Sequence, residues 1–189
     1  ALANPAILTM MALTTLGFGG SFAAFTFITP ILTDVAGFSA ATASILLIVF
    51  GVATFAGNLA GGRLIGRFGW QRTLRLLLVL LALTQVVLAL TLSLQWAMVA
   101  VLFIWGVCSF GMSPAFQAGM LATAERYTPG AVDFASGLNI SAFNIGISLG
   151  AFAGGVLVSR GLMASTPWVG VIASVLAFVP LAWLSRKVV

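Results

Sequence analysis

The sequence predicts an all-α, polytopic membrane protein in which six transmembrane helices form two inverted three-helix repeats. Three observations predict this fold class: the composition, the placement of the charges and an internal repeat. Hydrophobic residues make up 61% of the 189 residues and charged residues only 6%. With a mean hydropathy of +1.20, the chain is far from the composition of a soluble domain and typical of one embedded in lipid.

The charged residues fall between long apolar runs and never inside one. An ionised side chain at the bilayer centre costs about 2.5–3.5 kcal/mol, so each charge-free run is a candidate span, and about 20 apolar residues cross the hydrocarbon. The longest run, 76–124, holds two spans divided by the polar turn at 93–95. We therefore expect one membrane domain, 1–189, with spans at about 6–31, 41–62, 74–93, 97–122, 134–158 and 166–185.

The basic residues predict the orientation. Seven of them fall on the side that carries both termini, and only Arg160 falls on the other side. Under the positive-inside rule both termini are cytoplasmic. The net charge of +5 is therefore a topology signal, and we expect the lipid bilayer and not a nucleic acid as the partner of these residues.

The chain partly resembles itself at half its length. The pattern G-x-x-A-G-G-x-L occurs at 57–64 and 150–157, and G-x-S-x-A occurs at 19–23 and 111–115. Repeats of about 1–95 and 96–189 would each hold three spans, so the second copy enters the membrane from the opposite side, an arrangement typical of transporters. The alternative is chance recurrence of small residues that pack helices closely. The expected packing glycines are Gly57, Gly61, Gly146, Gly150 and Gly154.

Three segments resemble the C-terminal half of a major facilitator superfamily transporter. Residues 62–72 (GRLIGRFGWQR) look like the second-half copy of the family's loop motif, G-x-L-A-D-R-x-G-R-R. Residues 136–146 (SGLNISAFNIG) are similar to the start of the family's eleventh span, and residues 25–30 (FTFITP) to the end of its seventh. Within the family, the chain resembles the bacterial twelve-span efflux permeases of the drug and sugar (arabinose-efflux-like) group.

The resemblance implies half of a twelve-helix fold in the bacterial inner membrane. Its partner would be the N-terminal six-helix half of the same transporter, or a second copy of this chain. The expected cytoplasmic loop residues are Gly62, Arg63, Arg67, Gly69 and Arg72. Gly66 stands where the family's first-half motif has an acid, so the gating role of that acid does not carry over. The chain starts without Met or a signal-peptide pattern, and we expect it to be a segment of a longer protein.

The residue inventory excludes most membrane enzymology. The chain has no His, so a Ser-His dyad cannot form, and neither Asp lies in a predicted span, which excludes an intramembrane aspartyl protease. Clustered metal ligands are lacking. We therefore expect no enzyme, no cofactor and no metal. Since proton relays normally use buried carboxylates or histidines, any proton coupling would reside in the other half.

Candidate substrate-cavity residues are polar or aromatic side chains within the spans. Trp105 lies about 12 Å into its span, near the midplane, where an aromatic ring can stack on an apolar, aromatic or sugar face. Asn139, Asn144 and Gln117 each bring an amide into hydrocarbon. The remaining candidates are Phe18, Ser21, Phe25 and Thr26. The alternative role is helix packing for the aromatic residues and interhelical hydrogen bonding for the amides.

These observations favour a secondary active transporter half that exports small organic compounds by alternating access, with drug and sugar substrates both open. The alternative is a six-span structural or self-associating membrane module without transport activity of its own. Six further spans before Ala1 in the native polypeptide would distinguish the two.

Overall fold

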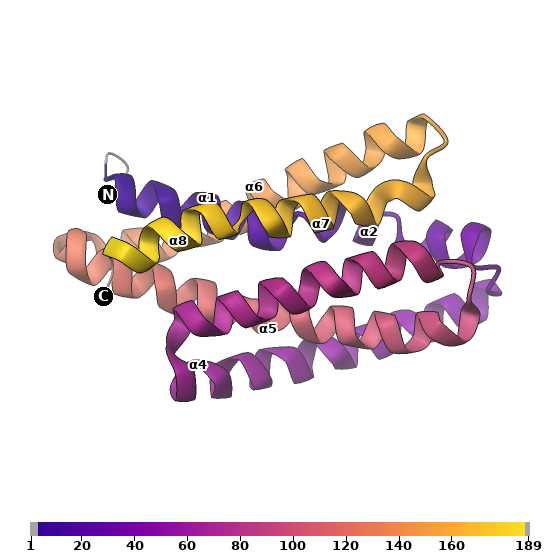
Figure 1. Ribbon diagram of the computed structural model, residues 1–189, viewed down its shortest axis with the longest axis horizontal. Helices are drawn as coiled ribbons and strands as arrows, with labels where there is room; N and C mark the ends of the chain where they lie inside the picture. Colours follow the sequence, from indigo (N-terminus) through magenta and orange to yellow (C-terminus); the bar gives the residue numbers. More distant parts are fainter. Residues whose placement is uncertain (1–3, 188–189) are drawn as a thin grey trace.

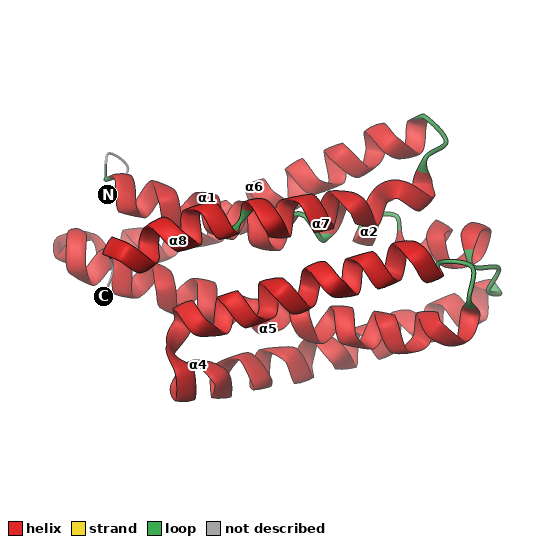
Figure 2. Ribbon diagram, viewed as in Figure 1, coloured by secondary structure: helices red, strands yellow, loops and turns green. Residues whose placement is uncertain are grey.

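The computed structural model describes residues 4–187 as a bundle of helices joined by short connections, with no strand in that part of the chain (Figure 2). The prediction of an all-helical protein is confirmed. The helices are α1 (Pro5–Gly19), α2 (Phe22–Phe25), α3 (Ile28–Pro30), η1 (Ile31–Val35), α4 (Ala40–Thr91), α5 (Gln95–Tyr127), η2 (Pro129–Ala131), α6 (Val132–Ser159), η3 (Met163–Ser165), α7 (Thr166–Leu176) and α8 (Phe178–Lys187).

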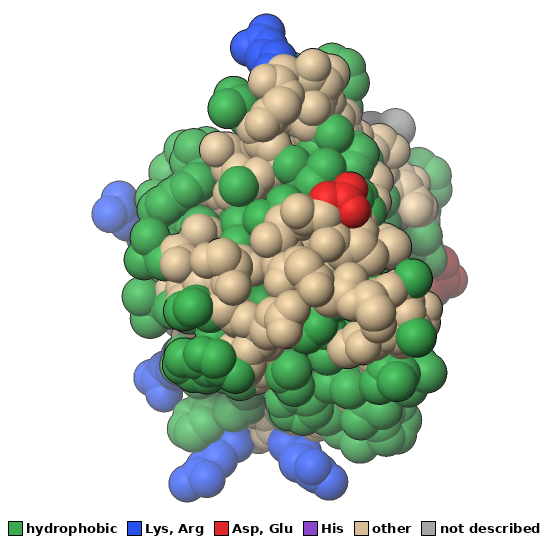
Figure 3. Space-filling view, turned by 90° about the vertical axis from the view of Figure 1, so that its right-hand side faces the viewer, with side chains coloured by type: hydrophobic (Ala, Val, Ile, Leu, Met, Phe, Trp, Pro, Cys, Tyr) green, Lys and Arg blue, Asp and Glu red, His purple; other side chains and the backbone are tan. Residues whose placement is uncertain are grey.

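Four helical stretches of the described chain are long and apolar enough to cross a membrane. They are Ala40–Thr91, Gln95–Tyr127, Pro129–Ser159 and Met163–Lys187, and Pro5–Gly19 is a shorter apolar helix. Figure 3 looks onto the end of the bundle opposite the termini and shows hydrophobic side chains over the flanks, with basic side chains projecting at the outline. Lipid tails cannot hydrogen-bond to a backbone. Helices can face them because their N–H and C=O groups are paired within the helix.

Helix α4 contains a sharp turn at Gly69. Its 52 residues would extend about 78 Å as a straight helix, more than twice the hydrocarbon thickness. Gly69 has φ 76° and ψ 163°, a non-helical conformation that glycine adopts without a Cβ clash, and the chain reverses direction there (Figure 1). The loop expected at 63–73 is therefore wrong in extent, because helix continues on both sides of this single residue.

The first expected span, 6–31, is interrupted. Helix α1 ends at Gly19, and short helices follow until η1 ends at Val35. Glycine is a poor helix former, and the Gly19–Gly20 pair marks the first break. Phe27, with φ −110° and ψ 21°, marks the second. Pro30 is the last residue of α3, and the chain continues as the π-helical turn η1.

Both termini lie at one end of the bundle, together with the Gly69 turn and the α5–α6 connection (Figure 1). The hydroxyl of Tyr127 donates to the carbonyl oxygen of Lys187 over 2.7 Å, which ties the end of α5 to the end of α8. The α5–α6 connection is shorter than the expected 123–133, because α5 extends to Tyr127 and α6 begins at Val132.

Close backbone contacts at glycines bring α4 against α5 and α6 against α1 and α2. A Cβ added to Gly57 of α4 would lie 2.5 Å from the carbonyl oxygen of Val107 on α5, and one added to Gly150 of α6 would overlap the carbonyl of Gly19 on α1. The other expected packing glycines, Gly61, Gly146 and Gly154, lie equally close to the backbones of Gly111, Thr15 and Ala23. No larger residue fits at these crossings without moving a helix.

Candidate functional site

Aromatic side chains from five helices form a connected cluster inside the bundle. Neighbouring ring centroids lie 4.7–6.3 Å apart, mostly in edge-to-face geometry, the separation at which the positive edge of one ring attracts the face of another. The members of this aromatic cluster are Phe18, Phe22, Phe25, Phe50, Trp105, Phe110, Phe116 and Phe143. It brings the expected residues Phe18, Phe25 and Trp105 into one assembly.

Trp105 is completely enclosed in this conformation, with 0% of its surface exposed. Its ring meets Phe50 at 5.5 Å and Phe25 at 6.0 Å, both nearly perpendicular. The indole N–H is buried and has no hydrogen-bond acceptor. A buried donor without a partner costs about 1–3 kcal/mol, so Trp105 keeps an unused polar group beside the apolar rings of Phe25 and Phe50.

A chain of hydrogen bonds joins three helices beside the aromatic cluster. The Thr14 hydroxyl of α1 donates to Asn139 Oδ1 over 2.8 Å, and Asn139 Nδ2 donates to Gln117 Oε1 over 2.8 Å. Gln117 Nε2 in turn donates to Ser136 Oγ over 2.6 Å. We call these four residues the amide chain. Two of the expected cavity residues, Asn139 and Gln117, therefore bond to each other in this conformation, and Asn139 is fully buried.

A second polar contact joins the first helical segment to α5. The hydroxyls of Ser21 and Ser109 lie 3.2 Å apart, and both side chains are buried. Ser21 occupies the break between α1 and α2. Because a hydroxyl is both donor and acceptor, either side chain can donate in this contact.

Asn144 and Thr26 lie outside the interior. Both are exposed, and each side chain bonds to a carbonyl of its own helix: Asn144 Nδ2 to Ile140 at 3.1 Å, and the Thr26 hydroxyl to Phe22 at 2.7 Å. Asn144 belongs to a row of exposed small or polar residues on α6, and α4 carries a similar row. We call these rows the exposed polar faces: Gly137, Ser141, Asn144 and Ser148 on α6, and Ser44, Gly51 and Asn58 on α4, where the exposed side chains of Ile48 and Phe55 lie between them.

The expected loop motif lies around the Gly69 turn. Gly62, Arg63, Arg67 and Arg72 are exposed there, and the Arg67 guanidinium lies 5.2 Å from the centroid of the Phe68 ring. Within residues 4–187, no three or more His, Cys, Asp or Glu side chains gather into a group that could hold a metal ion.

Sequence reasoning missed several residues that complete these assemblies. Thr14, Ser136 and Ser109 provide hydrogen-bond partners, while Phe50 and Phe143 bridge the aromatic cluster between helices. Single hydroxyls and phenylalanines are common in membrane helices, so none stood out. Position within the apolar run was the available signal, because Phe50 lies mid-run as Trp105 does.

Long apolar helices with charges at their ends define a multi-pass membrane protein. Residues 11–189 match the model of the Major Facilitator Superfamily, and the chain belongs to this family of transporters. It is 36% identical over 180 residues to the MFS-type transporter YtbD of Bacillus subtilis, covering 95% of this chain and 45% of that protein. It is 31% identical over 187 residues to the inner membrane transport protein YdhP of Escherichia coli, covering 98% and 47%.

A more distant relative is named a probable sugar efflux transporter, from Helicobacter pylori. It is 26% identical over 181 residues, covering 96% of this chain and 44% of that protein. The chain thus spans about half the length of the relatives it matches. A crystal structure of an auto-inhibited POT family peptide transporter superposes with a TM-score of 0.73 at 20% identity, covering 97% of this chain and 37% of that one. At this identity the likeness shows the fold alone.

Proposed function

We propose that this chain is the C-terminal half of a secondary transporter that exports small organic compounds, of drug or sugar class, by alternating access. It would lie in the bacterial inner membrane with both termini in the cytoplasm. The substrate would bind near the midplane, between this half and an N-terminal six-helix half.

Six spans are part of the proposal. The interrupted segment from Pro5 to Val35 would be the first span. The parts of α4 before and after Gly69 would be the second and third, each long enough to cross about 30 Å of hydrocarbon. Helices α5 and α6 would be the fourth and fifth, and α7 with α8 the sixth.

The glycine contacts support an inverted repeat. The sequence repeat equates Gly57 with Gly150 and Gly19 with Gly111. In the bundle Gly57 packs against Gly111, with 3.2 Å from a Cβ added at Gly111 to the Gly57 carbonyl oxygen, and Gly150 packs against Gly19. Two equivalent residue pairs therefore make equivalent contacts, as two copies of one three-helix unit would.

The observation that carries the proposal is the pair of exposed polar faces on α4 and α6. Asn144 lies near the middle of α6, and its amide retains hydrogen-bonding capacity beyond the single bond to Ile140. Lipid tails offer no partner, so a polar face at this depth belongs against another helix or a water-filled cavity. A second transporter half that rocks against these two faces would provide both.

The aromatic cluster supports an uncharged or aromatic substrate. It supplies ring faces without any Asp, Glu, Lys or Arg, and the Trp105 N–H is the one cluster donor that lacks an acceptor. A movement of the surrounding helices that uncovers Trp105 would let this N–H bond to a substrate hydroxyl or carbonyl. The relative named for sugar efflux fits such a substrate, because sugar rings stack on indole faces.

The acids of this half lie at the ends of the bundle, which supports our proposal that any proton coupling resides in the other half. Asp34 lies in η1, Glu125 near the end of α5 and Asp133 at the start of α6, and all three are exposed. A proton relay across the membrane needs a titratable group within the span.

The test uses the full native polypeptide in energised bacterial cells loaded with radiolabelled arabinose or with ethidium. We expect export of at least one probe, abolished by an uncoupler of the proton gradient. Trp105→Phe keeps the cluster filled but removes the N–H, and Asn144→Ala removes the exposed amide, so each should lower export at least threefold. Asn4→Ala, at the end of the bundle, is the matched amide control and should export normally.

Two results would reject the proposal. One is the absence of export of either probe by well-folded protein, which would favour a structural module. The other is normal export by both the Trp105 and the Asn144 variants, which would remove these residues from the substrate path.

A further inference from the structure

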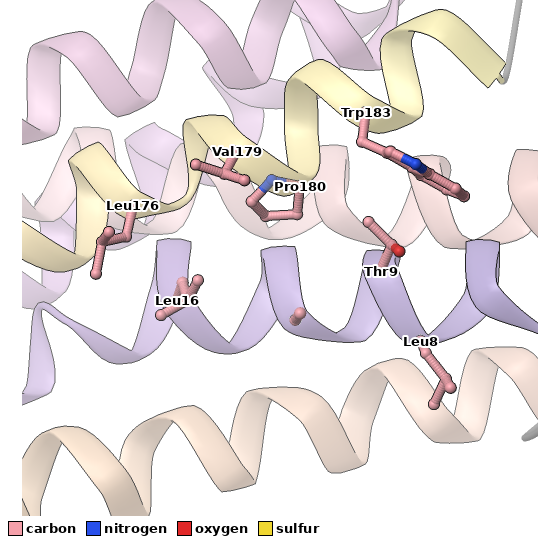
Figure 4. Close-up of a pocket in the computed structure, with 8 residues that line it drawn as sticks. Leu8, Thr9, Leu16, Leu176, Val179, Pro180 and Trp183 are labelled. Atoms are coloured by element: carbon pink, nitrogen blue, oxygen red, sulfur yellow. The ribbon is translucent and has the colours of Figure 1, made fainter.

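A long groove runs along the outside of the bundle between α1 and the α7–α8 pair (Figure 4). Its main hollow has a volume of about 590 Å³. Its walls are Leu8, Ala12 and Leu16 on α1 and Leu176, Val179 and Trp183 on the opposite side. The hydroxyl of Thr9, which also lines it, donates to the carbonyl of Pro5 over 2.7 Å. Apart from the Trp183 indole N–H, the groove therefore presents an apolar surface.

The groove continues at both ends. Trp183 also lines a smaller hollow of about 200 Å³ together with Asn4, Tyr127 and Lys187. Leu16 also lines a hollow of about 120 Å³ that reaches Gly146 and Gly150 of α6. From Asn4 to Gly19, α1 rises about 22 Å, and one leaflet of hydrocarbon is about 15 Å thick. The three hollows together extend from the charged end of the bundle past the depth of one lipid tail.

The charged side chain that lines the polar end of the groove is basic, and the acids at this end of the bundle, Glu125 and Asp133, lie outside the hollow. Lys187 lines the end hollow, and Arg186 beside it is exposed. No Asp or Glu lines any of the three hollows, and Glu125 is exposed on α5 outside them. Trp183 stands at the junction of the apolar and polar parts, and an indole ring favours this position because it joins an apolar body to an N–H donor.

We propose that this groove binds an anionic phospholipid. One acyl chain lies along α1 between Leu16 and Trp183, and the phosphate headgroup meets Lys187. The acyl chain of a zwitterionic lipid fits the same groove. Its headgroup is attracted less strongly to Lys187, because the lipid's own cation lies beside the phosphate. Basic hollows between membrane helices at the cytoplasmic surface are suited to anionic headgroups. The site goes beyond the proposed transport function and depends only on the membrane placement of the chain.

The test measures quenching of Trp183 by brominated lipids. The full native polypeptide is reconstituted in vesicles of phosphatidylcholine with increasing dibrominated phosphatidylglycerol, or with dibrominated phosphatidylcholine as the comparison. The Trp183 signal is the difference between each protein and the same protein carrying Trp183→Phe. We expect phosphatidylglycerol to quench Trp183 with at least about fivefold higher relative affinity, the effect of one basic residue near the surface.

Two matched pairs of variants identify the two parts of the site. Lys187→Gln should lower the preference for phosphatidylglycerol at least threefold, whereas Arg160→Gln, which removes the same charge at the opposite end of α6, should leave it unchanged. Ala12→Phe fills the groove and should reduce quenching of Trp183 by both lipids. Ala100→Phe, at an exposed alanine of α5, should not.

Three outcomes would overturn the proposal. Equal quenching by the two lipids would show an unselective lipid belt. A Lys187→Gln protein that keeps the wild-type preference for phosphatidylglycerol would show that the Lys187 charge does not select the lipid bound in the groove. A Trp183 that neither lipid quenches would show that a protein segment covers the groove. Export of arabinose or ethidium is measured separately, so failure of the lipid site is distinguishable from failure of the transport function.

Discussion

Replacement of Asn139 by leucine tests whether the amide chain holds α1, α5 and α6 together. Leucine has a similar size and branching but no polar atom, so the substitution removes both hydrogen bonds of Asn139, each 2.8 Å long, without opening a large cavity. Asn139 is fully buried, so water cannot replace them. The perturbation is therefore electrostatic and not steric.

The expected loss of unfolding free energy is about 2 kcal/mol. Two interhelical hydrogen bonds in a membrane contribute about 0.6 kcal/mol each on average. Thr14 can turn its hydroxyl to a carbonyl of its own helix, as Thr84 does to Leu80 over 2.7 Å. Gln117 Oε1 has no such alternative; an unpaired buried acceptor costs about 1–3 kcal/mol, and because Gln117 is only partly buried we take the lower end.

The assay is unfolding of the full native polypeptide in mixed micelles with rising SDS fraction, followed by circular dichroism. Asn144→Leu is the matched control, because this exposed amide donates to the Ile140 carbonyl of its own helix, and we expect it to lose less than about 0.5 kcal/mol. In a double-mutant cycle, Asn139→Leu and Gln117→Leu should be non-additive, because the second change removes the orphaned acceptor. Equal losses for the Asn139 and Asn144 variants, or an additive cycle, would refute the reasoning.

Three other substitutions test packing, burial and backbone conformation, each measured by the same unfolding assay. Gly150→Val should cost at least about 2 kcal/mol, because its Cβ would overlap the Gly19 carbonyl, whereas Gly62→Val meets open space and should fold normally. Gln85→Met should raise stability by about 1 kcal/mol, because both amide atoms of Gln85 are buried without a partner in the structure. Gly69→Ala should cost about 1 kcal/mol, because φ 76° is unfavourable for a residue with a Cβ.

Each of these substitutions has an outcome that contradicts its basis. Equal stability of the Gly150 and Gly62 variants would mean that the α1–α6 crossing is looser than the backbone contact indicates. A destabilised Gln85→Met protein would mean that its amide is hydrogen-bonded in the membrane. A Gly69→Ala protein as stable as wild type would place the turn elsewhere in α4.

The sequence predicted the helical membrane fold and the approximate place of each apolar segment, but not the ends and interruptions of the helices. The loop expected at 63–73 reduced to the single residue Gly69, because polar Arg-rich residues continue a helix readily beyond the hydrocarbon. The breaks near Gly20 and Phe27 lie within an apolar run, where hydropathy is uniform and carries no signal.

The candidate site, too, could be predicted from the sequence only in part. Trp105, Gln117 and Asn139 could be singled out because polar and indole groups are costly in hydrocarbon wherever they occur. Their partners could not. The bond from Asn139 to Gln117 joins residues on different helices, and the ring pair of Phe25 and Trp105 joins residues still farther apart in the chain. Such pairings depend on the depth and rotation of each helix.

The sequence by itself determined that this protein lies in a lipid bilayer. Each charge or unpaired backbone group in lipid has an energetic cost that does not depend on which residues surround it. Only the tertiary structure decided which side chains meet. It enclosed Trp105 with its N–H unpaired, turned Asn144 outward and left a groove between α1 and α8 that ends at Lys187. The physical reason is that contacts between helices depend on their crossing geometry, which no single segment encodes.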